Sequence, residues 1–188
     1  TLSHQSTGNN AIGSKSLFSN TKGYLNTAIG FQSMVSNTEG MLNTAIGPKS
    51  LFKNQVGWGN IAIGNEALYN NDGIWNTAIG VQTLMRNTTG TGNIGVGFQA
   101  LQENTSGVFN TAIGLYAMRF NDTGTSNTAV GSNALYWSKT DENTAIGVNA
   151  LYYNQLGGQN TAVGYGTLYY NVRGEYNLAL GYLAAIWN

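Results

Sequence analysis

The sequence repeats itself every 16 or 17 residues. The string Asn-Thr-Ala-Ile-Gly, or a close variant, begins at Asn9, Asn26, Asn43, Asn60, Asn76, Asn93, Asn110, Asn127, Asn143, Asn160 and Asn177. Successive starts are 17 residues apart in eight cases and 16 in two, so eleven copies tile residues 9–188. A fixed short period is the signature of a repeat architecture. We therefore expect residues 9–188 to form one repeat domain, and residues 1–8 a partial N-terminal coil or a cap.

Each copy carries Asn and Gly at fixed places. With the first Asn as position 1, Gly occupies position 5 throughout and Asn occupies position 12 except at Ser138. A second Gly at position 15 is missing only where Asp141 and Glu142 stand. Asn side chains bond neighbouring backbone and tolerate left-handed angles, and Gly takes positive φ without steric cost. We interpret these residues as structural corners, with stacked Asn amides hydrogen-bonded along the axis.

Two short apolar stretches lie between the corners. Position 3 is Ala in ten copies and Gly95 in the other, position 4 is always branched aliphatic, and positions 8 and 9 pair a small residue with a large one in most copies. These stretches are too short for helices, Gly recurs too often, and β-branched residues are frequent. The pattern predicts an all-β fold: a β-solenoid (β-roll) of about 11 coils with 16–17 residues and two short strands each. At ~4.8 Å per strand the rod is about 50 Å long.

Both faces of the expected strands are largely apolar. Positions 2 and 4 share one face and position 3 takes the other, because side chains alternate along a strand. One face can fill the coil interior, which leaves a second apolar stripe along the rod. Such a stripe exceeds what a soluble monomer normally exposes. We therefore expect it to be buried against copies of the same chain, in a parallel homotrimer, although symmetry alone does not select three copies over two.

Position 11 changes character along the chain. It is polar or charged in the first six copies and aromatic in the last five: Phe120, Trp137, Tyr153, Tyr170 and Trp187. Aromatic faces with polar tips suit wet binding sites, so this column is the candidate ligand-binding site for a sugar or another flat ligand. The alternative is a wider core or a tighter contact between copies at that end.

Thr is the commonest residue at position 2, which raises the possibility of a Thr ladder that orders water on ice. Thr shares its face with the aliphatic position 4, however, and Ile61, Ile94 and Leu178 replace it as core residues would. We therefore expect Thr to face inward or towards an interface, and keep a monomeric ice-binding or surface-binding solenoid as an alternative.

Composition argues against several other functions. Eight basic and eight acidic residues give zero net charge, and charged residues make up only 9% of the chain. Binding to nucleic acid needs clustered Lys and Arg. The chain has no cysteine and one histidine, His4, which we expect to be an ordinary exposed residue near the terminus. We expect no enzymatic activity, no metal site, no cofactor, no nucleic acid partner and no membrane insertion, since no apolar run approaches ~18 residues.

The Asn-Thr-Ala-Ile-Gly string, followed by two variable residues and Ala-Leu, resembles two related groups across residues 9–188. One is the left-handed β-roll head of trimeric autotransporter adhesins, whose repeats carry a similar Ser-Val-Ala-Ile-Gly core. The other is the repeat region of phage tail-fibre-like and bacterial surface proteins, often placed before a self-cleaving intramolecular chaperone. Because no chaperone domain is present and the chain begins at Thr1, we expect a piece of a longer or matured fibre.

The resemblance implies a trimer located outside the cell, on a cell surface or a virion tail fibre. It also implies binding to a cell surface, a glycan, a protein receptor or a matrix. The sequence therefore predicts a non-enzymatic structural or adhesive segment of a trimeric surface or tail fibre. A ligand-free spacer shaft remains open as a further alternative.

Overall fold

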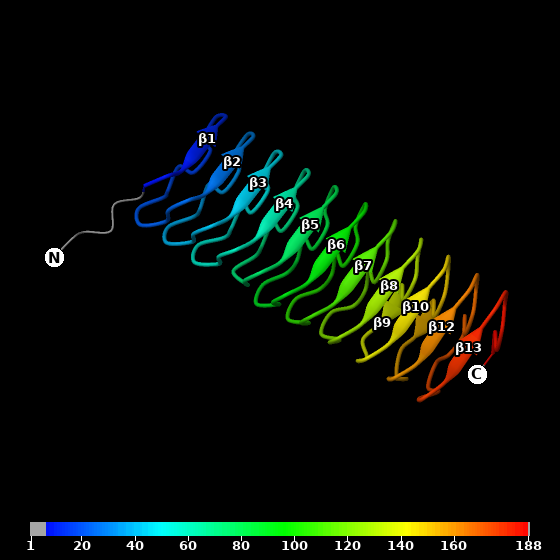
Figure 1. The fold of residues 1–188 in the computed structure, drawn as a ribbon. Coiled ribbons are helices and arrows are strands. Elements are labelled where there is room, and N and C mark those ends of the chain that lie inside the picture. Colours follow the sequence, from blue (N-terminus) through cyan, green and yellow to red (C-terminus); the bar gives the residue numbers. More distant parts are fainter. Residues whose placement is uncertain (1–6, 188) are drawn as a thin grey trace.

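The chain folds into a β-solenoid of about ten turns, in which the first ten copies of the repeat each form one coil and the eleventh begins another (Figure 1). The computed structural model describes residues 7–187, and the coils are numbered 1 to 11 from the copy at Asn9 to the copy at Asn177. One parallel sheet of eleven strands runs the length of the rod, and a two-stranded sheet accompanies it. The long sheet contains β1 (Asn10–Ile12), β2 (Thr27–Ile29), β3 (Thr44–Ile46), β4 (Ile61–Ile63), β5 (Thr77–Ile79), β6 (Ile94–Val96), β7 (Thr111–Ile113), β8 (Thr128–Val130), β10 (Thr144–Ile146), β12 (Thr161–Val163) and β13 (Leu178–Leu180). The small sheet contains β9 (Trp137–Ser138) and β11 (Tyr153–Asn154).

The strands stack in the register that the repeat predicts. Each residue pairs with its equivalent in the next coil, as Ala28 does with Ala45. The pairing continues across the 16-residue coils, because Ile61 pairs with Thr77 and Thr128 with Thr144. The missing residue is therefore absorbed outside the strands. The all-β solenoid is confirmed.

The second stretch of each coil, which we call the return segment (positions 6–11), differs from the strand expected there. Positions 7 and 9 adopt left-handed backbone angles, as in Gln99 (φ 55°) and Leu101 (φ 51°). These angles turn the chain, so that Ala100 and Leu101, at positions 8 and 9, are both fully buried and the expected alternation is lost. A second strand forms only as β9 and β11, with an isolated bridge between Tyr170 and Trp187.

The core is a narrow layer between the sheet and the return segment. Ala at position 3 and Leu or Met at position 9 are fully buried in most coils and form one continuous cluster. Gly95 shows how thin this layer is, because a Cβ there would lie 2.6 Å from Thr83 Cγ2 and 3.6 Å from Leu84 Cδ1. A left-handed angle costs roughly 1–2 kcal/mol for Leu, and its full burial contributes about 2 kcal/mol. Burial of the position-9 side chain thus offsets the strain that its backbone carries.

Asn ladders join the coils at two corners. At position 1, the Asn43 N–H donates to Asn26 Oδ1 (3.0 Å), and Asn43 Nδ2 donates to the Gly57 carbonyl (2.8 Å). At position 12, Asn54 Nδ2 donates to Asn37 Oδ1 and to the same Gly57 carbonyl, both at 3.0 Å. The Asn hydrogen bonds along the axis are confirmed. The left-handed angles expected for these Asn residues are not found among residues 7–187, where they lie at positions 5, 7, 9 and 17 instead.

The two Gly columns are required for different reasons. Position 5 needs Gly for its backbone angle, since φ lies between 116° and 137° from Gly13 to Gly181. Position 15 needs Gly for space. A Cβ on Gly57 would collide with Asn54 Oδ1 and would lie 2.6 Å from the Gly73 carbonyl oxygen of the next coil. Coils can stack closely at this corner only where the side chain is absent.

Candidate functional site

The long sheet presents Thr and Ile to the outside. At position 3 Ala28 and Ala45 are fully buried, whereas the Thr residues at position 2 are half-buried and Ile113 at position 4 is 41% exposed. The predicted second apolar stripe is confirmed. The expectation that Thr faces inward is wrong, because the thin core accepts only Ala from the sheet side. Whether Thr lies at an interface between copies remains a prediction.

Apolar residues flank the strands on both sides, at position 6 in seven coils and at position 17 in five, the other position-17 residues being Gly59, Gly92, Ser126, Glu142 and Gln159. Position 6 carries Phe31, Val81, Phe98, Leu115, Val148, Tyr165 and Tyr182, all exposed by 41% or more. Position 17 carries Leu25, Leu42, Trp75, Phe109 and Tyr176, all exposed by 50% or more. Positions 2, 4 and 6 contain no charged residue in any coil. We call positions 2, 4 and 6 together the sheet face.

The predicted aromatic residues lie in one column, and most of them stack on one another. Phe120 and Trp137 are parallel with centroids 3.9 Å apart, Tyr153 stacks on Tyr170 at 5.4 Å, and Tyr170 stacks on Trp187 at 4.2 Å. Within residues 7–187 no ring contact joins Trp137 to Tyr153, so the column consists of two stacks. The structure therefore brings the five residues together as two groups, with a break beside Trp137.

A second aromatic column at position 10 supports the first. Tyr136, Tyr152 and Tyr169 stack with centroids 5.0 and 4.9 Å apart. Their rings meet the position-11 rings edge to face, as Tyr136 meets Phe120 at 5.2 Å. Burial in this double column, followed by the neighbouring phenols, raises the pKa of Tyr152 and of Tyr169 above the usual value. Most ring faces are thus covered by other rings, which leaves mainly ring edges open to a ligand.

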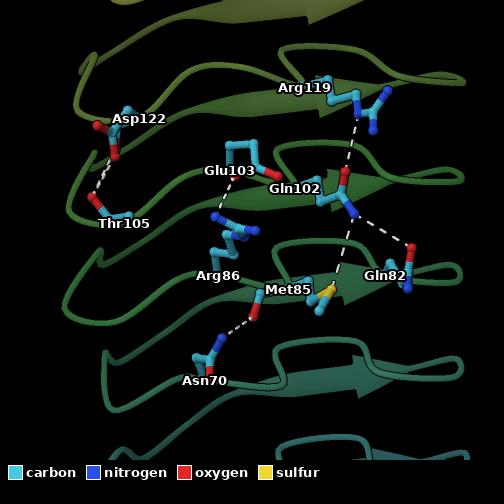
Figure 2. Close-up of polar contacts among 9 residues, drawn as sticks. All are labelled: Asn70, Gln82, Met85, Arg86, Gln102, Glu103, Thr105, Arg119 and Asp122. Carbon is cyan, nitrogen blue, oxygen red and sulfur yellow. Dashed lines mark hydrogen bonds and ion pairs between the residues drawn. The ribbon is translucent and has the colours of Figure 1, made fainter.

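The middle coils replace these rings with a polar network (Figure 2). Arg119 Nε donates to Gln102 Oε1 (3.0 Å), and Arg86 pairs with Glu103 (3.1 Å). Arg119 also lies over the Phe120 ring, with its guanidinium carbon 5.0 Å from the centroid. The network therefore ends where the aromatic column begins.

The position-12 Asn ladder is interrupted at coil 8. Ser138 cannot supply the amide that would donate to Asn121, and Asn121 Oδ1 is the one side-chain N or O atom within residues 7–187 that is buried without a hydrogen-bond partner. Two residues later Thr140 occupies the place of the position-15 Gly, since Asn127 Nδ2 donates to its carbonyl (2.7 Å). The sequence assigned this place to Asp141 and Glu142, and that assignment is wrong.

Ser138 and Thr140 exchange the roles of the usual pair. In six of the 17-residue coils Asn at position 12 holds its Oδ1 where a Cβ at position 15 would collide, as Asn121 does beside Gly124, whereas in the shortened coil 4 such a Cβ would meet the Gly90 carbonyl and Asn76 Nδ2 instead. Thr140 Oγ1 then replaces the missing amide oxygen and accepts a hydrogen bond from Asn154 Nδ2 (3.0 Å). The ladder therefore resumes in coil 9, while Asn121 Oδ1 in coil 7 stays without a hydrogen-bond donor.

Shallow hollows surround this corner. One of about 370 Å³ is lined by Phe120, Trp137, Ser138, Lys139, Gln155 and Leu156. A second, of about 270 Å³, extends towards the Arg86–Glu103 pair and is lined by Phe120, Asp122, Trp137 and Lys139. A third, of about 410 Å³, has Lys139, Asp141, Glu142, Glu175 and Tyr176 in its wall. Sequence reasoning singled out Phe120 and Trp137 but missed Lys139, Gln155 and Leu156. The 16-residue spacing and the exceptional Ser138 were the signals that could have located them.

Residues 7–187 contain no group of three or more His, Cys, Asp or Glu side chains that could hold a metal ion. Over the same residues no helix occurs that could cross a membrane. His4 lies outside the described residues. In comparisons with protein families, curated proteins and solved structures, nothing matches this chain.

Proposed function

We propose that the chain is a non-enzymatic segment of an extracellular fibre, on a cell surface or a virion tail, which assembles as a parallel homotrimer. The observation that carries this proposal is the charge-free sheet face. The strands alone form a strip of about 50 Å by about 10 Å. The flanking columns widen it beyond the few hundred Å² that a soluble monomer usually exposes in one patch.

The shape of this surface suits three copies around a common axis. The centre of an interface between protein chains is depleted of charged residues, as the sheet face is. Each chain in a cyclic trimer has two neighbours, and the apolar columns at positions 6 and 17 offer one flank to each of them. The resemblance of the repeat to adhesin heads and tail fibres supports the same arrangement.

A charge placed on the sheet face tests the assembly. We expect Ile79→Lys combined with Ile113→Lys to sediment as a monomer with an unchanged circular dichroism spectrum, because a buried unpaired ammonium group is strongly unfavourable. The matched control is Ser36→Lys, which places a lysine in the position-11 column that already contains Lys53. Equal sedimentation of all three proteins would contradict the proposal.

A second candidate function is ice binding by a monomer. The specific observation in its favour is the outward Thr column on a charge-free parallel sheet. The sequence argued against ice binding because Thr was expected to face inward, and that expectation is wrong. Thermal hysteresis in a protein that sediments as a monomer would support this function. Its absence in a trimeric protein supports the fibre segment.

A further inference from the structure

The corner of coil 8 forms a notch in the side of the rod. Two residues separate the ladder Asn from Gly in the neighbouring corners, namely Asp122 and Thr123 in coil 7, and Gln155 and Leu156 in coil 9. In coil 8 only Lys139 separates Ser138 from Thr140. A shorter corner between two longer ones leaves a recess, and two hollows lie there.

The irregular corner is unfavourable for stability. A buried acceptor without a partner costs about 1–3 kcal/mol, and Asn121 Oδ1 is left in that state. Ordinary Asn and Gly residues at positions 138 and 140 would remove this cost, as they do in the other coils. Departures from an otherwise consistent pattern are expected mainly at functional sites. This departure from the pattern marks the corner as a candidate functional site.

The floor and walls of the notch differ in chemistry. Phe120 and Trp137 form an apolar floor beside the break in the aromatic column. Lys139 and Gln155 are exposed, and neither side chain makes a hydrogen bond or salt bridge within residues 7–187. Asp122 of coil 7 also lines one of the hollows, and one of its carboxylate oxygens accepts a hydrogen bond from Thr105 Oγ1 (2.6 Å). The notch thus combines an aromatic surface with free donors and acceptors.

We propose that this notch binds a neutral oligosaccharide chain. A sugar ring can pack its apolar C–H groups against the open parts of the Phe120 and Trp137 rings, and a few polar side chains fix the orientation of its hydroxyl groups. The charged residues that line the two hollows are Arg86, Lys139, Glu103 and Asp122, two of each sign, so no net charge favours an ionic ligand. The hollows continue along the rod from Arg86 to Leu156, which suits a linear chain. None of the residues that line the two hollows lies at positions 2, 4, 6 or 17, so this site rests on the proposed fibre role but not on trimer formation.

Retention on immobilised polysaccharides tests the proposal. The probes are cellulose, chitin, xylan and dextran as neutral polymers and alginate as an anionic one. We expect at least one neutral polymer to retain the protein and alginate not to. Trp137→Ala should weaken retention at least tenfold. Tyr170→Ala, which removes a stacked ring of the same column outside the notch, should change it less than twofold. Retention by alginate alone or by none of the polymers, or equal retention of the two variants, would overturn the proposal.

A filled notch provides a test in which Trp137 remains. Ser138→Asn with Thr140→Gly, together with one Thr inserted after Lys139, restores the 17-residue corner. We expect this variant to unfold at no lower urea concentration than the wild type and to lose retention at least tenfold. The matched control inserts one Thr after Asp72 in coil 4 and should keep retention. Sedimentation of every variant reports assembly separately, so a wrong oligomer and a wrong ligand site give different results. Retention by the filled variant would overturn the proposal.

Discussion

Coils 4 and 8 both have 16 residues, yet only coil 8 breaks the Asn ladder. In coil 4, Asn71 Nδ2 donates to Asn54 Oδ1 (3.2 Å) and Asn71 Oδ1 accepts from Asn87 Nδ2 (2.6 Å), so the ladder continues. In coil 8, Ser138 ends it. The comparison shows that a one-residue deletion is compatible with a regular corner. The exchange of Asn and Gly for Ser and Thr, rather than the deletion, makes coil 8 exceptional.

The two shortened corners are also closed differently. Asp72 of coil 4 accepts hydrogen bonds from the backbone N–H groups of Gln55 (2.7 Å) and Val56 (3.2 Å). Asp141 of coil 8 accepts one from Thr125 (2.7 Å), and Lys139 extends into the recess. The coil 4 carboxylate thus caps positions 13 and 14 of the preceding coil, whereas the coil 8 carboxylate caps position 16, which lies beyond the shortened corner.

The largest effect is expected from truncation of the buried position-9 Leu, which tests whether coils 4 and 8 have equivalent cores. Leu68 and Leu135 are fully buried with φ of 51° and 50°. We expect Leu68→Ala and Leu135→Ala each to lower the free energy of unfolding by about 2–5 kcal/mol. Urea denaturation should give values within about 1 kcal/mol of each other. Clearly unequal losses of unfolding free energy would show that the two coils differ in their cores as well as in their corners.

The next largest effect is expected from a substitution that breaks the position-12 Asn ladder in coil 4, where the ladder is intact. Asn71→Ser removes the donor to Asn54 and the acceptor for Asn87, and should cost about 2–4 kcal/mol of unfolding free energy, because both partners stay buried. The matched change Ser138→Ala removes only one contact, to Thr140 Oγ1 (3.3 Å), and should cost about 1 kcal/mol or less. Similar losses in urea denaturation would mean that the ladder contributes little to stability.

A double-mutant cycle tests whether Ser138 and Thr140 form a matched pair. Ser138→Asn alone should destabilise the protein, because the larger amide has to fit beside the Thr140 side chain, whose Oγ1 lies 3.3 Å from Ser138 Oγ. Thr140→Gly alone removes the acceptor for Asn154. We expect each to cost about 1–2 kcal/mol, and the double variant to unfold with about 1 kcal/mol more free energy than the wild type. Additive effects would exclude the coupling.

The smallest expected effect is a loss of stability at high pH that arises from the position-10 Tyr column beside coil 8. Burial raises the pKa of Tyr152 and Tyr169, so above about pH 10 the unfolded chain ionises first. The stability that these phenols contribute is complete below that pH and is lost as the pH rises through their folded pKa values. The urea midpoint should fall between pH 8.5 and 11, and less in Tyr152→Phe with Tyr169→Phe. An unchanged fall in the double variant would assign the effect to other groups.

Much of this fold can be predicted from spacing. The register of the sheet follows from the period, and the Asn hydrogen bonds follow from stacking equivalent amides in adjacent coils. The left-handed angle at Leu101 could not be predicted, because Leu rarely adopts it and no local signal marks it. It depends on the shape of the whole coil, in which the chain turns at this point so that the side chains of positions 8 and 9 both enter the core.

The outward direction of Thr and the place of Thr140 were missed for other reasons. Alternation shows which side chains share a face but not which face is inside, and only the thinness of the core excludes Ile113 from it. At a deletion the alignment is ambiguous, so Asp141 and Thr140 could each be matched to the Gly column. Only the irregular spacing of the repeat could have predicted the notch from the sequence, since Lys139 and Gln155 are unremarkable as single residues.

The central claim is that the sheet face is buried between copies of this chain. Static light scattering of the unmodified protein over a range of concentrations measures this most directly. The account predicts a mass of three times the 20.0 kDa of one chain, constant on dilution. A constant mass of one chain would contradict it.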